Sequence, residues 1–247
     1  MKEERRNSAG SAKAGRIISL ICTAAVLLTA TIVTVCAWAA PAAKSVTAAQ
    51  SVSAKKDKPF AGKKILIAYF TRADNTAHPA GNKGLADATS SASLKAPGNA
   101  GELAAIIQKT VGGELFSIQV QHPYNEDYNK VLERANEEEL SGARPVLKGP
   151  MPDLNSYDII FLGYPNWCYN CPMAVLSFLE QAKLKGKTIL PFCVHGSGEL
   201  AKSIQSIRAA APNNVIGQPL GISRGEMGQA VEKVSTWLAE TARRQKK

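Results

Sequence analysis

The sequence predicts an α/β fold in which a five-stranded parallel sheet, in the strand order 2-1-3-4-5, lies between two layers of helices. Short runs that are apolar almost throughout alternate with amphipathic runs from residue 63 to the C-terminus. A strand that is apolar throughout is buried on both faces, as in a parallel sheet. Five such strands joined by helices favour the doubly wound arrangement, in which helices cover both faces.

Each strand is expected where a short apolar run is bounded by polar or turn-forming residues. The first run reads KILIAYF and the third reads YDIIFLGYP, and neither alternates polar with apolar side chains. The last run is the weakest, because Pro219 has no N–H to donate to a neighbouring strand. The predicted strands are 64–70, 114–120, 157–165, 187–195 and 214–223.

The helices are expected between these strands, where apolar residues recur every three or four positions. In the first helix, Leu103, Ile106 and Val111 have helical spacing, and the run ends on two glycines, which commonly terminate helices. Pro172 falls in the first turn of another helix, where its missing N–H has no partner to lose. The predicted helices are 101–113, 128–145, 172–186, 199–212 and 228–244.

The first 43 residues have the pattern of an export signal. A basic flank precedes residues 17–43, which carry no charge. This run is longer than a typical signal-peptide core and reaches the roughly 20 residues that a membrane span needs, while the triplet 37–39 (AWA) fits a cleavage site. Both a cleaved signal peptide and an uncleaved membrane anchor therefore stay open for residues 1–43. Either places the rest of the chain outside the cytoplasm, because the basic flank stays inside.

Residues 44–62 are rich in Ala, Ser and Lys and are expected to form a flexible linker without a core of its own. The folded domain is then expected at residues 63–247. The chain has a formal net charge of +10, which by itself is compatible with nucleic acid or an anionic surface as partner. Its lysines are spread along the chain and it has no nucleic-acid motif, so nucleic acid is not expected.

Three loops are expected to form the ligand site, because ligands of such sheets lie beyond the carboxyl ends of the strands. The first loop leads through residues 98–100 into the first helix, whose unpaired backbone N–H groups suit a phosphate. The second loop, residues 164–173, follows the third strand, and the third loop, residues 194–198, follows the fourth. Each loop alone is a weak signal, and their joint placement is a strong one.

Five short segments in and beside these loops resemble the flavodoxin-like FMN-binding family, in particular the exported or lipoprotein-type flavodoxins of anaerobic bacteria. They are 69–72 (YFTR), 98–100 (GNA), 123–129 (PYNEDYN), 163–173 (GYPNWCYNCPM) and 195–198 (HGSG). The resemblance covers about residues 63–240 and implies a flavodoxin-like fold. It also implies FMN as cofactor, with the phosphate on the first loop and the isoalloxazine ring between the second and third.

The resemblance and the loop positions together give a set of expected cofactor-binding residues. They are Thr71, Arg72, Gly98, Asn99, Ala100, Pro165, Asn166, Trp167, Cys168, Tyr169, Asn170, Val194, His195, Gly196, Ser197 and Gly198. For three of them a simpler role stays open. Arg72 is either a phosphate partner or a solvated loop residue, Trp167 is either a wall of the ring pocket or core, and His195 either contacts the ligand or only caps or packs the loop.

Three positions depart from the family pattern. Ala100 stands where the family has Thr, which removes one hydroxyl donor but keeps the backbone N–H groups. Cys168 replaces a Trp, and Tyr169 replaces a Gly that lets the backbone approach the ring. Since a single neutral hydrogen bond is worth about 0.5–1.5 kcal/mol, we expect weaker flavin binding rather than none. Tyr169 is itself a candidate to stack on the flavin.

A second register of the phosphate site lies at residues 71–76, because its segment 74–76 (DNT) mimics the Gly-Asn-Thr of the family. Residues 98–100 are favoured, because they lead directly into a helix. Pro79 prevents a helix directly after residue 76, and the carboxylate of Asp74 would repel a phosphate.

Cys168 and Cys171 form a Cys-x-x-Cys pair, which also suggests a thiol redox site. A thioredoxin fold is not favoured, because the pair follows a third parallel strand. Three interpretations stay open: a structural disulfide, which an exported protein permits, two inert thiols, and a dithiol that exchanges electrons with the flavin. The helix that follows is expected to lower the pKa of a thiol at its N-terminus. A zinc site is not expected, because the three histidines are scattered on separate elements.

The sequence therefore favours an FMN-binding electron-transfer protein or small flavin reductase that acts outside the cytoplasm. Carrier flavodoxins are usually acidic and this chain is basic. The difference favours a membrane component as the redox partner protein, or a small acceptor such as a quinone. Two other classes stay open: a flavin-free binding module on the same scaffold, and a thiol–disulfide redox protein that uses Cys168 and Cys171. The three loops contain no residues arranged for hydrolysis.

Overall fold

The computed structural model describes residues 58–77 and 94–245. The predicted export segment and the predicted linker up to residue 57 lie outside these ranges. Within the described ranges, we find no helix whose length and apolar character would let it span a bilayer.

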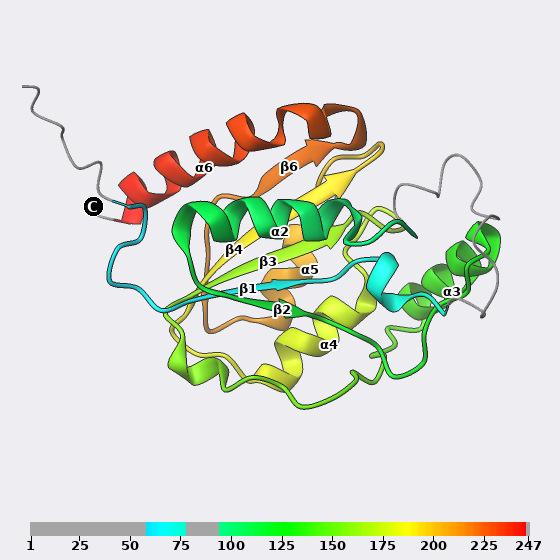
Figure 1. Cartoon of the computed structure of the whole chain (residues 1–247). Helices are drawn as coiled ribbons and strands as arrows, with labels where there is room; N and C mark the ends of the chain where they lie inside the picture. Colours follow the sequence, from blue (N-terminus) through cyan, green and yellow to red (C-terminus); the bar gives the residue numbers. More distant parts are fainter. Residues whose placement is uncertain (1–57, 78–93, 246–247) are drawn as a thin grey trace, which may run out of the picture. The chain divides into compact units, whose positions relative to one another are not determined.

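A parallel sheet forms the centre of the fold (Figure 1). Its strands follow the order β2-β1-β3-β4-β5, and the short β5 and β6 lie one after the other along the outer edge of β4. The predicted fold class and strand order are therefore confirmed. The strands are β1 (Ile65–Tyr69), β2 (Glu114–Ser117), β3 (Ile159–Pro165), β4 (Thr188–His195), β5 (Val215–Ile216) and β6 (Leu220–Ser223).

Four helices cover the two faces of the sheet, with α2 and α6 above it and α4 and α5 below it in Figure 1. Each face has its own apolar core: Ile107 and Trp237 contribute to the upper one, and Phe178 and Ile207 to the lower one. The bounds are α2 (Gly98–Val111), α4 (Met173–Ala182), α5 (Ser203–Ala210) and α6 (Ala230–Gln245).

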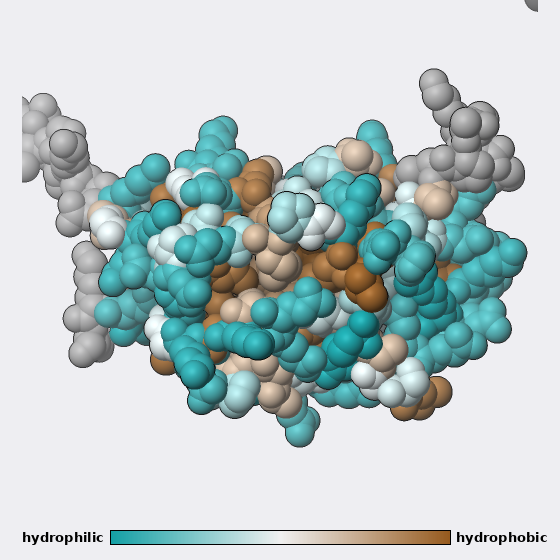
Figure 2. Space-filling model, turned by 90° about the horizontal axis from the view of Figure 1, so that it is seen from below, coloured by the Kyte–Doolittle hydropathy of each residue, from teal (hydrophilic) through white to brown (hydrophobic). Residues whose placement is uncertain are grey.

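Helix α4 is apolar on all sides, and residues 173–179 are all buried. Such a helix needs cover on its outer side as well as on the side of the sheet. The connection that leads into β3 gives this cover, and its Leu147 and Met151 pack against the lower core. Figure 2 shows this side of the molecule as mainly hydrophilic, with hydrophobic residues visible between the hydrophilic ones.

Helix α3 (Tyr128–Leu140) lies beyond the end of the sheet toward which the strands point, and not on either face (Figure 1). Asp127 caps its first turn by accepting a hydrogen bond from the backbone N–H of Lys130. Only Val131 and Ala135 of this helix are buried. Because α3 sits at the carboxyl ends of the strands, it becomes part of the site described below.

Several element boundaries differ from the sequence prediction. The single last strand is two strands, β5 and β6, since Pro219 between them cannot donate to β4. Helix α5 begins at Ser203 and not at residue 199, because Glu199 and Ala201 have positive φ angles of 48° and 40°. Helix α4 ends at Ala182, where Lys183 adopts the left-handed conformation.

The described end of the predicted linker packs on the domain. Phe60 is only 8% exposed, and its ring meets the ring of Phe161 edge to face at a centroid distance of 5.6 Å. Residues 58–62 therefore belong to the fold, because an aromatic side chain in this stretch fills a place in the upper core.

Candidate functional site

A cavity of about 320 Å³ lies at the carboxyl ends of β1, β3 and β4. This volume is within the range of small-molecule sites, which begins at about 300 Å³. Strands β3 and β4 pair up to Pro165 and Val194, so the second and third loops leave the sheet side by side. Thirteen of the sixteen residues expected at the ligand site line the cavity: Thr71, Arg72, Gly98, Asn99, Ala100, Pro165, Asn166, Trp167, Cys168, Tyr169, Val194, Gly196 and Ser197.

The other three expected residues do not line the cavity. Asn170 is buried and supports the second loop through its side-chain hydrogen bonds. Gly198 lies under the ring of Tyr169. His195 faces Gly221 of β6, and its buried Nδ1 has no hydrogen-bond partner among the described residues.

The cavity also contains residues that the sequence analysis missed. Four come from α3 and one follows β6: Tyr128, Val131, Leu132, Ala135 and Arg224. The four on α3 have the i, i+3, i+4, i+7 spacing of one helix face. This stripe was visible in the sequence, but nothing local indicated that α3 would stand at the end of the sheet.

The first loop contains a short 3-10 turn, Ala73–Asn75, and is stabilised by hydrogen bonds of its own side chains. The buried side chain of Asn75 donates to the carbonyl oxygens of Thr71 and Ile118, and its Oδ1 accepts from the N–H of Val120. The hydroxyl of Thr76 donates to the carbonyl of Arg72 at 2.8 Å. Asn75 and Thr76 thus stabilise the loop itself and do not line the cavity, whereas Thr71, Arg72 and residues 98–100 do.

Arg72 is buried between the first loop and the segment before α3. Its Nη2 donates to the carbonyl oxygen of Glu126 at 2.8 Å, and its guanidinium lies 5.9 Å from the centre of the Tyr128 ring. With 5% of its surface exposed, Arg72 is not a solvated loop residue. It connects the first loop to the start of α3 and brings a positive charge to the cavity wall.

Helix α2 presents its N-terminus to the cavity. Among the described residues, no side chain caps this end by a hydrogen bond, so the first N–H groups of the helix that lack a backbone acceptor stay open to a ligand. Gly98 has a φ of 71°, which lets the chain turn sharply into the helix. A methyl group on Gly101 would lie 3.0 Å from Cβ of Pro97 and 3.4 Å from the Tyr69 ring, so this first turn is packed closely. The exposed N–H groups and the helix dipole suit an anion.

The second loop is a two-residue reverse turn. The backbones of Trp167 and Asn170 exchange hydrogen bonds of 2.8 Å in both directions. Between them, Cys168 and Tyr169 have positive φ angles of 51° and 60°. Glycine or asparagine usually fills such positions, and other residues cost of order 1–3 kcal/mol each. The turn holds the Cys168 and Tyr169 side chains at the cavity.

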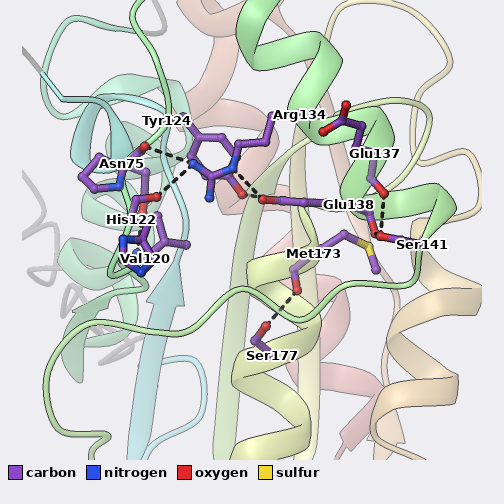
Figure 3. Close-up of polar contacts among 11 residues, drawn as sticks. Asn75, Val120, His122, Tyr124, Arg134, Glu137, Glu138, Ser141, Met173 and Ser177 are labelled. Atoms are coloured by element: carbon purple, nitrogen blue, oxygen red, sulfur yellow. Dashed lines mark hydrogen bonds and ion pairs between the residues drawn. The ribbon is translucent and has the colours of Figure 1, made fainter.

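Trp167 is both a cavity wall and part of the core. Its ring meets Phe70 at a centroid distance of 5.3 Å and Tyr124 at 5.1 Å, edge to face in both cases. Two side chains of α3 hold Tyr124 in place. The hydroxyl of Tyr124 donates to Glu138, and the Arg134 guanidinium lies 3.9 Å from the centre of the Tyr124 ring. Figure 3 shows Arg134 over the Tyr124 ring and joined to Glu138. The indole is therefore held rigidly between the sheet and α3.

Glu139 of α3 ties the second loop to the residues before α5. Its carboxylate accepts from Nδ2 of Asn170 at 3.1 Å and pairs with the ammonium of Lys202. The backbone N–H of Lys202 also donates to the carbonyl of Tyr169. Asn166 adds a further link, because its Nδ2 donates to the carbonyl of Glu199. Three segments far apart in the sequence are thus connected at the cavity.

The thiols at the site are free and protonated. Cys168, Cys171 and Cys193 are unpaired in the structure. Burial raises the pKa of the Cys168 thiol, with a further rise from the negative charge of Glu139, and burial raises the pKa of Cys171 to about 12. The expected lowering by the following helix is wrong, because Cys171 precedes the N-cap Pro172 and lies in the core, where a thiolate loses its solvation.

The third loop approaches Arg224 closely. A methyl group on Gly196 would lie 2.5 Å from Nη2 of Arg224, so the guanidinium lies directly against this glycine. Arg224 directly follows β6, which pairs with the end of β4 through His195 and Ser223. This pairing brings a cation that is distant in sequence to the rim of the third loop.

The cavity wall is electropositive. Its charged side chains are Arg72 and Arg224, and none of the described residues that line it is Asp or Glu. The described residues also contain no group of three or more His, Cys, Asp or Glu side chains that could hold a metal ion. The arrangement suits a ligand with an anionic end and a flat aromatic part, which Trp167, Tyr169 and Tyr128 can contact.

Comparison with known proteins agrees with this arrangement. A sequence model described as Flavodoxin matches residues 85–240. A crystal structure assigned as a flavoprotein, from Bacteroides eggerthii DSM 20697, is 25% identical with a TM-score of 0.55, and the match covers 73% of this chain and 98% of that one. A second, from Bacteroides uniformis ATCC 8492, is 24% identical with a TM-score of 0.55 and covers 72% and 99%. No curated protein matched the sequence.

Proposed function

The chain belongs to the flavodoxin family, and from this premise we propose that it binds FMN in the cavity at the carboxyl ends of β1, β3 and β4. The observation that carries the proposal is the uncapped N-terminus of α2, which opens on the same cavity as Trp167 and Tyr169. A helix N-terminus suits the phosphate of FMN, and aromatic side chains suit its ring.

The residues present fit this cofactor. Asn99 and Ala100 would hold the phosphate with backbone N–H groups, whereas the N–H of Gly98 already donates to the carbonyl oxygen of Lys95. The hydroxyl of Thr71 can donate as well, because it accepts from the N–H of Asp74 and keeps its own hydrogen. Trp167 and Tyr169 would flank the ring. Bound FMN would supply electron or hydride transfer, while the protein sets the position and the electrostatics of the ring.

We infer further that the protein acts as an electron carrier or a small flavin reductase outside the cytoplasm. The uncharged run at residues 17–43 behind a basic flank supports the location. Acidic carriers attract basic partner proteins, and the net charge of +10 of this chain supports a different kind of redox partner. A membrane component or a small acceptor such as a quinone is such a partner.

The thiol–disulfide alternative has less support. A reactive cysteine needs a lowered pKa, whereas the pKa values of Cys168 and Cys171 are raised. The flavin-free alternative rests on Ala100 and Tyr169. Against it, Ala100 keeps its backbone N–H at the cavity, and Tyr169 adds an aromatic surface there.

An absorbance spectrum of the purified full-length protein, with chromatography of the released chromophore, tests the proposal. We expect a yellow protein that releases FMN, or an apoprotein that takes up added FMN with a micromolar or lower dissociation constant. A variant with Trp167→Ala and Tyr169→Ala should lose most of this binding. A colourless protein that takes up neither FMN nor riboflavin contradicts the proposal and favours a flavin-free binding module.

A further inference from the structure

Arg224 is a cation of the cavity wall that has no carboxylate partner among the described residues. It is exposed, and no ion pair or hydrogen bond joins its guanidinium to another described side chain. The carboxylate nearest to it in sequence is engaged elsewhere, since Glu226 pairs with Lys233 at 2.6 Å. The charge of Arg224 is therefore available to a ligand.

Strand order places Arg224 at the opposite side of the cavity from the first loop. Thr71 follows β1, whereas Arg224 follows β6, and β3 and β4 lie between these two strands. Neighbouring strands are about 4.8 Å apart, so β1 and β6 are separated by roughly 14 Å. If the phosphate lies at the first loop and the N-terminus of α2, Arg224 faces the ring end of the ligand and not the phosphate.

The guanidinium of Arg224 lies against Gly196 of the third loop. A methyl group on Gly196 would come within 2.5 Å of Nη2 of Arg224. The capping box between Ser223 and Glu226 also holds the backbone on both sides of Arg224. A cation at this rim, next to a cavity wall without described Asp or Glu side chains, exerts an electrostatic field on a ring bound there.

We propose that Arg224 stabilises the negative charge of reduced FMN and so raises the reduction potential of the bound cofactor. This inference rests on the proposed function. Two-electron reduction adds two electrons from the redox partner and one proton to N5, and when N1 stays unprotonated the ring gains one negative charge. A cation near the ring binds this anionic form more tightly than the neutral oxidised form.

The test compares the two-electron potential of bound FMN in the full-length protein and three variants, with dithionite as reductant and a reference dye. In Arg224→Gln we expect the affinity for reduced FMN to fall about tenfold relative to oxidised FMN, as for one unit charge acting through partly solvated protein. For a two-electron couple this equals a potential about 30 mV lower. Arg224→Lys should keep most of the potential. Arg208→Gln removes the same charge from an exposed position on α5 and should leave it unchanged.

Binding of oxidised FMN and of riboflavin, which lacks the phosphate, separates the outcomes. If Arg224→Gln weakens FMN but not riboflavin and leaves the potential unchanged, Arg224 contacts the phosphate and the inference is overturned. The inference is also overturned if Arg208→Gln lowers the potential equally, since the effect then belongs to net charge. If the unmodified protein binds neither flavin, the proposed function itself is wrong. A lower potential in Arg224→Gln alone, for FMN and riboflavin alike, supports the inference.

Discussion

The ring of Tyr169 lies directly over Gly198: a methyl group added to Gly198 would come within 2.7 Å of Cδ1 of Tyr169. The two residues belong to different loops, and both have positive φ angles, 60° at Tyr169 and 78° at Gly198. The contact closes one side of the cavity with an aromatic ring that is itself 63% exposed. It explains how a Tyr can replace a Gly in the second loop, because a Gly in the third loop makes room for it.

We predict that Gly198→Ala destabilises the protein by about 1–3 kcal/mol, partly through its own backbone strain and partly through the clash with Tyr169. In a Tyr169→Gly background the clash is absent while the strain remains. The cost of Gly198→Ala should therefore fall by about 0.5–1 kcal/mol, a coupling that a double-mutant cycle of urea unfolding measures. Gly228→Ala is the matched control, because an added methyl there meets nothing within 4 Å. Equal costs of Gly198→Ala in both backgrounds would show that the two loops do not interact.

A second prediction concerns Ala100 in the first turn of α2, where this chain lacks the Thr of the family pattern. The side chain lies at the cavity wall and is 3% exposed. Ala100→Thr should add one hydroxyl donor at the phosphate and tighten FMN binding by about 0.5–1.5 kcal/mol, roughly two- to tenfold. Fluorescence titration of the apoprotein with FMN and riboflavin measures this. Riboflavin affinity should not increase, and Ala105→Thr on the exposed side of α2 should change neither affinity.

A third prediction concerns Asn170, which holds the second loop in place. Its Oδ1 accepts from the N–H of Cys171 at 2.9 Å and its Nδ2 donates to Glu139, while only 6% of the residue is exposed. Asn170→Ala leaves that N–H without a partner, and we expect the free energy of unfolding to fall by about 1–3 kcal/mol. FMN affinity should fall with it, because the turn at Cys168 and Tyr169 loosens. Asn136→Ala, an exposed position on α3, serves as control and should change stability by less than about 0.5 kcal/mol.

A fourth prediction follows from the pKa of Cys171, which burial raises to about 12. An unfolded cysteine ionises near pH 8.5. Above that pH the unfolded state releases a proton that the folded state keeps, so stability is fully present below about pH 8.5 and declines as the pH rises toward 12. The unfolding free energy of Cys171→Ala should decline less steeply from pH 8.5 to 10.5. Parallel pH profiles for the two proteins would mean that Cys171 does not keep its proton in the folded state.

The burial of Cys168 and Cys171 also predicts that their thiols are alkylated slowly. At pH 8 iodoacetamide should modify Cys168, which lines the cavity, more slowly than a free cysteine, since its pKa is raised. Cys171, at 2% exposure, should react only after unfolding. Mass spectrometry of tryptic peptides distinguishes the two sites. Rapid modification of Cys171 in the folded protein would restore the dithiol as a redox candidate.

Much of the fold could be predicted because its signals are local. The apolar run from Ile65 to Tyr69 and its counterpart in β3 mark buried parallel strands, and the helical spacing of Leu103, Ile107 and Val111 marks α2. Boundaries were less accurate where a single backbone angle decides them. The positive φ angles of Glu199 and Ala201 delay α5, and no pattern of side chains announces them.

The candidate site was predicted in part for the same reason. Residues directly after strands must lie at one edge of a parallel sheet, so Thr71, Pro165 and Val194 could be grouped from the sequence. Leu132 and Arg224 could not be placed at the site from the sequence. Helix α3 is rich in charged residues, and nothing in its own sequence indicates that it borders the cavity. Arg224 is separated by about 30 residues from the third loop beside which it lies.

The sequence by itself determined the strand order, the three loops and the helix start that suits a phosphate, because each depends on periodicity or on position relative to a strand end. The tertiary structure alone decided that α3 closes one wall of the cavity, that Arg224 stands over Gly196, and that Cys171 is a protonated core thiol. These features depend on which distant segments touch and on how deeply a group is buried. The free energy of ionising a side chain is set by those surroundings and not by its neighbours in sequence.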